Sequence, residues 1–235
     1  ADAVVAVSAG VADDLAATAG LPRRLVTVVH NPVVPSDVDR RAAEPVDDPW
    51  LEPGEPPVIL GVGRLVPQKG FPTLLRAFAQ VRQQRPARLV ILGEAADRRA
   101  TVKRTAELQK LAAELGIADS VALPGYAVNP FAWMARAGVF VLSSTHEGFG
   151  NVLPEALACG CPVVSTDCPS GPAEILENGR WGQLVPVGDD QAMARAILAV
   201  LATPPDRAAL RSRATAFTVD AAIGRYEALV GGAWA

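Results

Sequence analysis

The amino-acid sequence predicts an α/β fold, a doubly wound parallel sheet of the Rossmann-like type. Strand-like runs of four or five apolar residues alternate with helix-like segments along most of the chain. These runs are continuously apolar, which is typical of parallel strands that are covered on both faces. In such folds ligands bind beyond the carboxyl ends of the strands, so the residues that follow each strand are the candidates for function.

The composition is that of a globular protein without a strong charge of either sign. The chain has 235 residues, half of them apolar, and a formal net charge of −3, which argues against nucleic-acid binding as its main role. Its apolar runs are too short to span a membrane and no signal peptide is visible, so we expect a cytoplasmic location, with membrane association of a longer protein left open. Cys159, Cys161 and Cys168 lack the spacing of a zinc site and are expected to be small buried residues in a reducing compartment.

The first part of the chain predicts a short βαβ piece followed by a hinge. The chain begins without a methionine and within a strand-like segment at 3–8, so we expect a C-terminal part of a longer polypeptide. Ser8 is a suitable cap for a helix over 11–18 that Gly20 would end, and a second strand is expected at 25–30. The region 31–57 contains seven prolines and predicts a linker or hinge.

The rest of the chain predicts one domain of alternating strands and helices. Strands are expected at 58–62, 88–92, 121–123, 139–142, 162–165 and 183–185. Helices are expected at 73–84, 102–115, 131–137, 152–159, 172–177, 191–201, 206–214 and 219–230.

The segment 147–155 holds two carboxylates, Glu147 and Glu155, on either side of a glycine-rich turn that opens a helix. This turn would leave backbone N–H groups free to bind phosphate oxygens and sugar hydroxyls. The expected donors are those of Phe149, Gly150, Asn151, Val152 and Leu153. Glu155 could accept two hydrogen bonds from the hydroxyls of a ribose. A helix-dipole role explains Glu155 alone and a loop-capping role explains Glu147 alone, but neither explains the pair.

Glycines and cations follow two of the expected strands. Gly63 allows the backbone to approach a ligand closely, and Arg64 and Lys69 offer positive charge near the same edge. A diphosphate leaving group gains negative charge as its bond to a sugar breaks, and two cations could stabilise it without a metal. Solvated loop charges are an equally good interpretation of this pattern alone. Gly93 would either keep the floor of a pocket open or form an ordinary turn.

The two histidines are not expected to act in catalysis. His146 is next to Glu147 on an extended segment and should point the opposite way. His30, at the hinge, is interpreted as a packing residue.

Taken together, these motifs resemble retaining glycosyltransferases of family 4, which have the GT-B fold. The matching segments are 61–65 with Lys69 and Gly70, 92–94, 147–155, 158–166 and 171–176. The resemblance implies that the chain is the C-terminal half of a GT-B enzyme. Residues 1–30 would be the tail end of the N-terminal acceptor domain and 31–57 the hinge. Residues 58–216 would be the donor-binding domain, and 217–235 a helix that returns toward the missing domain.

The same resemblance implies roles for individual residues. Arg64 and Lys69 would bind the diphosphate and assist its departure, and Glu147 would contact the transferred sugar. The implied donor-binding residues are Gly63, Gly93, Tyr126, Ala127, Phe149, Gly150, Asn151, Val152, Leu153 and Glu155, with Tyr126 and Ala127 facing the base. No metal and no cofactor would be required. Ala95 stands where the family usually has glycine, which puts the detail of the pocket floor in question.

The resemblance therefore implies a metal-independent hexosyltransferase. It would transfer a hexose or N-acetylhexosamine, with retention, from a UDP-linked donor to a glycan or lipid-linked acceptor, as in bacterial polysaccharide synthesis. We expect the chain alone to be inactive, because a GT-B active site closes between two domains. A UDP-sugar 2-epimerase is an alternative that the sequence does not exclude. A non-catalytic nucleotide-sugar-binding module is another, although it would have no reason to keep both Arg64 and Lys69.

Overall fold

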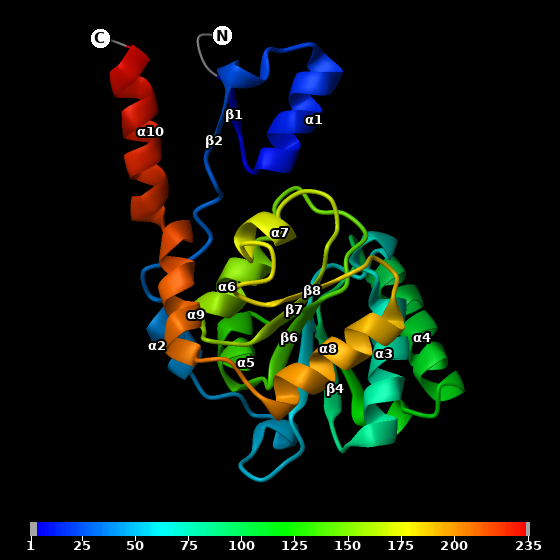
Figure 1. Ribbon diagram of the computed structural model, residues 1–235. Helices are drawn as coiled ribbons and strands as arrows, with labels where there is room; N and C mark the ends of the chain where they lie inside the picture. The colour runs from blue at the N-terminus through cyan, green and yellow to red at the C-terminus, as the bar shows by residue number, and fades with distance from the viewer. Residues whose placement is uncertain (1–3, 234–235) are drawn as a thin grey trace.

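The computed structural model describes residues 4–233, and contains a large and a small parallel sheet (Figure 1). Ala3, expected in the first strand, and residues 234–235 of the expected C-terminal segment lie outside the described residues. The large sheet has six strands in the order β5-β4-β3-β6-β7-β8. Its strands are β3 (Val58–Val62), β4 (Arg88–Leu92), β5 (Val121–Gly125), β6 (Val139–Leu142), β7 (Val163–Thr166) and β8 (Gln183–Val185). Every recorded pairing between them is parallel, which confirms the predicted fold class.

Helices cover both faces of the large sheet (Figure 1). One face carries α3 (Phe71–Gln84), α4 (Arg98–Glu114) and α8 (Asp190–Ala202). The other carries α5 (Pro130–Arg136), α6 (Val152–Ala158), α7 (Pro172–Ile175) and α9 (Arg207–Ala214). Neighbouring strand residues therefore enter opposite cores: Leu60 and Phe140 belong to the core under α5 and α6, and Ile59 to the core under α3. This two-sided burial explains why the strands are apolar at every position.

The N-terminal piece forms a small unit of its own. Strands β1 (Val4–Ala6) and β2 (Val26–Val28) pair in parallel and pack with α1 (Ala9–Ala19) around a minor core. The predicted caps are confirmed: the Ser8 hydroxyl accepts the Val11 N–H at 3.2 Å, and Gly20 ends the helix at φ 64°. Helix α10 (Val219–Ala233) extends away from the large sheet on the side where β2 lies (Figure 1).

The region 31–57 is more ordered than the linker that its prolines predict. It contains α2 (Val38–Ala43) and a 3-10 turn at Pro49–Leu51. Helix α2 is attached to the main domain, because the Asn129 side chain donates to the carbonyl of Arg41 at 2.9 Å and Arg136 donates to that of Ala42 at 3.1 Å. Two turns of helix between prolines leave too short a periodic pattern to recognise, so the prediction missed it.

The other boundaries differ from the predicted ones by a few residues at most, with one exception. Helix α4 begins at Arg98, four residues before the expected start at 102, because the Asp97 carboxylate caps it by accepting the Ala100 N–H at 2.8 Å. Among the described helices, none combines the length and the apolar character that crossing a membrane requires.

Candidate functional site

The sequence-predicted residues gather at the carboxyl edge of the large sheet, around the neighbouring strands β3 and β6. The strand order reverses its direction at this pair, which makes it the topological switch point where α/β sheets bind ligands. Lys69 follows β3 and Glu147 follows β6. The two loops are joined by hydrogen bonds, since the Thr145 N–H donates to the Gln68 carbonyl at 2.8 Å and the Ser143 hydroxyl to the Lys69 carbonyl at 2.7 Å.

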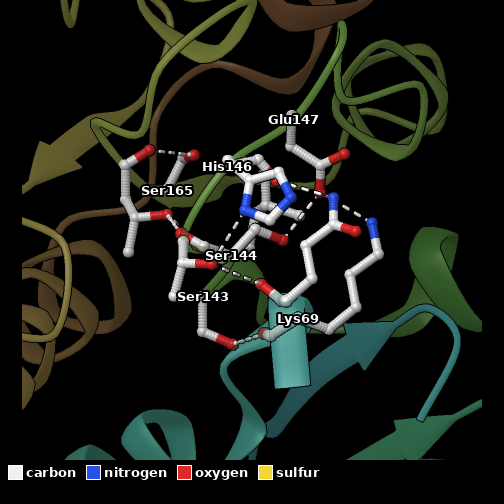
Figure 2. A network of polar contacts seen from close by, with 10 residues as sticks. Lys69, Ser143, Ser144, His146, Glu147 and Ser165 are labelled. Carbon is white, nitrogen blue, oxygen red and sulfur yellow. Dashed lines mark hydrogen bonds and ion pairs between the residues drawn. The ribbon is translucent and has the colours of Figure 1, made fainter. Parts of the chain in front are cut away.

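Lys69 and Glu147 form an ion pair at the centre of this edge (Figure 2). The Lys69 Nζ lies 2.6 Å from Glu147 Oε1, and the Ser144 hydroxyl donates to the same oxygen at 2.7 Å. Their side chains are only 14% and 9% exposed, so most of both charges is removed from water. The stem of Lys69 crosses Gly63: a Cβ placed there would lie 3.2 Å from the Lys69 side chain. The absence of a side chain at Gly63 thus leaves room for Lys69, which the sequence analysis predicted to be in the same site.

Gly93 is required by a close approach of two backbones. Its φ is 138°, and a Cβ at this position would overlap the carbonyl oxygen of Gly63. The contact is part of a continuing ladder, in which the Gly63 N–H donates to the Leu92 carbonyl at 3.0 Å and the Gly93 N–H to the Gly125 carbonyl at 2.7 Å. Gly93 is therefore neither an ordinary turn residue nor simply a gap, because it lets the ends of β3 and β4 meet beneath a cavity.

This first cavity has a volume of about 380 Å³. Its lining includes five residues that the sequence predicted: Gly63, Arg64, Gly93, Tyr126 and Ala127. Arg64 is exposed and makes no side-chain hydrogen bond or ion pair with any residue that the structure describes. Tyr126 is 70% exposed at the rim. A guanidinium and an exposed aromatic ring at one cavity are suited to a phosphate and to a stacked base.

The floor of the first cavity includes Ala95, where the family resemblance led us to expect glycine. The Ala95 N–H donates to the Thr101 hydroxyl at 3.0 Å, and that hydroxyl donates to the Asp97 carbonyl at 2.9 Å. The backbone N–H at this point is thus used by the start of α4. Glu94 also lines the cavity with an exposed carboxylate.

A second cavity of about 280 Å³ lies beside the Lys69–Glu147 ion pair. It is lined by Val7, Asn31, Lys69, Glu147, Gly148, Phe149, Gly150, Asn151 and Val152. Within residues 4–233, the backbone N–H groups of Phe149 to Val152 have no recorded acceptor, as the sequence predicted. The expectation of a free N–H at Leu153 was wrong, because this N–H donates to the Gly150 carbonyl at 2.9 Å and closes the turn. The Leu153 side chain is fully buried.

Glu155 is a partly buried carboxylate in the first turns of α6. It makes no side-chain hydrogen bond with the described residues, and burial raises its pKa to about 7. It lines neither cavity among the residues that define them, so its contact with a ribose remains a prediction. A desolvated acid with a raised pKa is nevertheless typical of functional sites.

The sequence missed several residues of the site. Glu94 lines the first cavity but was not among the predicted site residues, although a polar residue within two positions of the end of a buried strand is a sufficient signal. The same signal applies to Ser144, which binds Glu147. Val7 and Asn31 reach the second cavity from the N-terminal piece, and only a three-dimensional structure shows that.

The three cysteines behave as predicted. All are buried and none forms a disulfide. Burial raises the pKa of Cys159 and Cys161 to about 12 and that of Cys168 to about 11, so their thiols are protonated and unreactive at neutral pH.

Comparison with known proteins gives consistent matches over most of the chain. The family model for glycosyl transferases group 1 matches residues 44–217. An N-acetylgalactosaminyltransferase of Campylobacter jejuni, which acts on an N,N'-diacetylbacillosaminyl-diphospho-undecaprenol glycan, is 32% identical over 91% of this chain and 54% of its own length. The lipopolysaccharide core biosynthesis glycosyltransferase LpsE of Rhizobium meliloti is 37% identical over 68% of this chain and 44% of its own. The chain thus spans about half the length of these relatives.

Solved structures share the fold. HepE of Anabaena, determined in complex with UDP-glucose, is 26% identical, with a TM-score of 0.78 over 99% of this chain and 64% of its own. A glycosyltransferase from Rickettsia africae has a TM-score of 0.84 at 20% identity, over 97% and 62% of the two chains. The parallel sheet and its flanking helices are therefore those of GT-B glycosyltransferase structures.

Proposed function

The chain belongs to the glycosyl transferases group 1 family, and from this premise we propose that it is the donor-binding part of a retaining glycosyltransferase of family 4. It binds a UDP-linked sugar and takes part in transferring a hexose or N-acetylhexosamine to a glycan or lipid-linked acceptor. Two similarities support this choice of substrates: HepE has been solved with UDP-glucose, and the Campylobacter jejuni relative is named for a diphospho-undecaprenol acceptor. A cytoplasmic location stays a prediction.

One observation carries the proposal: the Lys69 side chain runs from Gly63, which lines the first cavity, to Glu147, which lines the second. We place the nucleotide in the first cavity, with the base near Tyr126, and the sugar in the second, near Glu147. The diphosphate then lies between them and binds Arg64 and Lys69, and Glu155 accepts hydrogen bonds from the ribose hydroxyls.

The proposed chemistry needs little more than fixed charge. The bond between the anomeric carbon and the phosphate oxygen breaks, and its electron pair stays on the diphosphate, where Arg64 and Lys69 stabilise it. The acceptor oxygen bonds the anomeric carbon on the same face, and its proton passes to the departing phosphate oxygen. The N–H groups of Phe149 to Val152 bind the sugar and the nearer phosphate. In this scheme the two cations take the role that a metal ion has elsewhere.

A second Rossmann-like domain of a longer polypeptide would supply the acceptor site. The relatives are about twice as long as the matched region, and among the described residues β1 and β2 pair only with each other. On this proposal the chain alone binds donor but does not transfer sugar, because its site is only half of a cleft.

A thermal-shift panel of UDP-, GDP- and ADP-sugars tests the donor class, since a ligand that binds only the folded protein raises its melting temperature. We expect a shift with UDP-sugars and none with the others, and we expect a smaller shift with UDP-sugars in Arg64→Ala. A larger shift with a GDP- or ADP-sugar would contradict the choice of nucleotide. No shift with any of the three would contradict the proposal that this chain binds the donor.

A further inference from the structure

His30 connects the N-terminal piece, α7 and the loop 148–151 of the second cavity. Its Nε2 lies 2.6 Å from Glu174 Oε1, and its side chain is only 12% exposed. Its ring stacks on that of Phe149, with the ring centroids 5.3 Å apart and the planes at 23°. It also packs against the ring of Phe217, with the centroids 5.5 Å apart. The expected packing role is confirmed, but the hydrogen bond to Glu174 was not predicted.

The charged groups around His30 select one tautomer. Arg225 Nη1 lies 3.3 Å from His30 Nδ1, and a guanidinium can only donate, so Nδ1 must accept and the proton must be on Nε2. That Nε2–H then donates to Glu174. The same carboxylate accepts the Ala9 N–H at 2.8 Å through its other oxygen. Arg213 also lies nearby: it donates to the Glu174 backbone carbonyl at 3.1 Å and pairs with Glu177 at 3.2 Å.

The pKa of Glu174 indicates that this acid is held in its charged form. Burial raises the pKa of Glu174, but the hydrogen bonds from His30 and Ala9 and the charge of Arg225 lower it, and the net direction is downward. An ionised Glu174 is the acceptor that the His30 Nε2–H needs.

The loop 148–151 is held on the same side by two further residues of the N-terminal piece. The Ser8 hydroxyl donates to the Gly148 carbonyl at 2.8 Å, and the Asn31 side chain donates to that of Asn151 at 2.9 Å. Between these two contacts, the Phe149 ring is fixed by His30, and the Phe149 carbonyl packs closely over Gly171, where a side chain would overlap it. The N–H groups proposed to bind the sugar thus lie in a loop whose aromatic residue, Phe149, stacks on His30 and packs edge-on against Phe217, with centroids 5.7 Å apart.

We propose that His30 is a positioning residue for the donor loop 148–151. It does not contact the donor; it fixes Phe149 so that the N–H groups of this loop converge on the second cavity. Arg225 and Glu174 hold the imidazole in the required orientation, so α10 and α7 both bear on the geometry of the loop. The expected effect of His30 on donor binding rests on the proposed function. The expected effect of His30 on the order of loop 148–151 does not depend on that function.

The tautomer can be measured without weakening the fold. The chain has two histidines, and His146 is exposed with its ring bonded only to its neighbour Thr145, so the His146→Ala variant leaves a single imidazole. The ¹⁵N shifts of that ring should show a proton on Nε2 and none on Nδ1, as its hydrogen-bond partners require. A ring protonated at Nδ1, or at both nitrogens, would overturn the proposed orientation.

The order of the loop is tested by the ¹H–¹⁵N nuclear Overhauser effect of its amides in the protein without added ligand. We expect His30→Ala to lower this value for residues 148–152, His30→Gln to restore it in part because its amide can donate to Glu174, and His146→Ala to leave it unchanged. Equal values in His30→Ala and His146→Ala would overturn the proposal.

Calorimetry then separates the two proposals. His30→Ala should bind UDP-glucose roughly tenfold more weakly than His146→Ala does, a typical size for coupling between a remote contact and a ligand. UMP should bind both variants equally, since it lacks the sugar and second phosphate assigned to the loop. Equal weakening of UMP and UDP-glucose would overturn the positioning role. A loop disordered by His30→Ala in a protein that binds no UDP-sugar would support the positioning of the loop and overturn the proposed function.

Discussion

Replacing Glu155 by glutamine should stabilise the fold and weaken nucleotide binding at the same time. Burial raises the pKa of this carboxyl from 4.5 to about 7, so the folded protein disfavours the charged form. In the unfolded chain the acid titrates near its ordinary value. The folded protein therefore binds more protons between these two pKa values, and its stability falls as the pH rises from about 4.5 to about 7.

The size of the effect follows from that pKa. At about 1.36 kcal/mol per pH unit, a rise from 4.5 to about 7 corresponds to about 3 kcal/mol as an upper value at pH 8. Glutamine has nearly the same shape and no charge, so Glu155→Gln should recover up to this amount at pH 8 and almost nothing at about pH 4.5. The lost carboxylate should cost nucleotide binding roughly 10- to 100-fold, as expected for hydrogen bonds to a charged group.

Urea denaturation of the wild-type chain and Glu155→Gln across this pH range measures the first effect, and calorimetry with UDP measures the second. Glu52→Gln is the matched control, because Glu52 is exposed and makes no side-chain hydrogen bond with the described residues. A stability difference that stays constant with pH would refute the argument from burial. Unchanged UDP affinity in Glu155→Gln would refute the ribose assignment.

Three further substitutions test the remainder of the site. Lys69→Met should destabilise the chain by about 3 kcal/mol, because it leaves the Glu147 carboxylate buried without its cation, and it should slow transfer in a longer active protein; an unchanged urea midpoint would contradict this. Gly93→Ala should cost at least about 2 kcal/mol, whereas Gly188→Ala, which also has a positive φ but has open space around it, should cost only about 1 kcal/mol, and equal losses would contradict the close approach. Arg64→Ala should leave the urea midpoint unchanged because the side chain is exposed, and should weaken UDP binding about tenfold; unchanged affinity would mean that Arg64 is a solvated loop charge.

The sheet and the order of its strands along the chain could be predicted because local signals sufficed. Each strand is a short apolar run between turn residues, and β3, β4 and β6 begin and end where the sequence predicts. The gathering of Arg64, Lys69 and Glu147 could also be predicted, because parallel strands deliver their following residues to one edge.

The features that were missed depend on contacts between distant parts of the chain. Helix α2 is too short to signal itself and is held by side chains from α5 and the loop before it. The partnership of His30 with Glu174 joins residues 144 positions apart, so no local pattern contains it. The path of the Lys69 side chain, from Gly63 at the first cavity to Glu147 at the second, is also not contained in the sequence spacing.

The most direct test of the account is a crystal structure of this chain with UDP-glucose bound. We predict that the diphosphate lies within hydrogen-bonding distance of Arg64 and Lys69, with the uracil beside Tyr126, a ribose hydroxyl on Glu155 and the glucose facing Glu147. A nucleotide bound away from the carboxyl edge of β3 and β6, or a diphosphate in contact with neither cation, would contradict it.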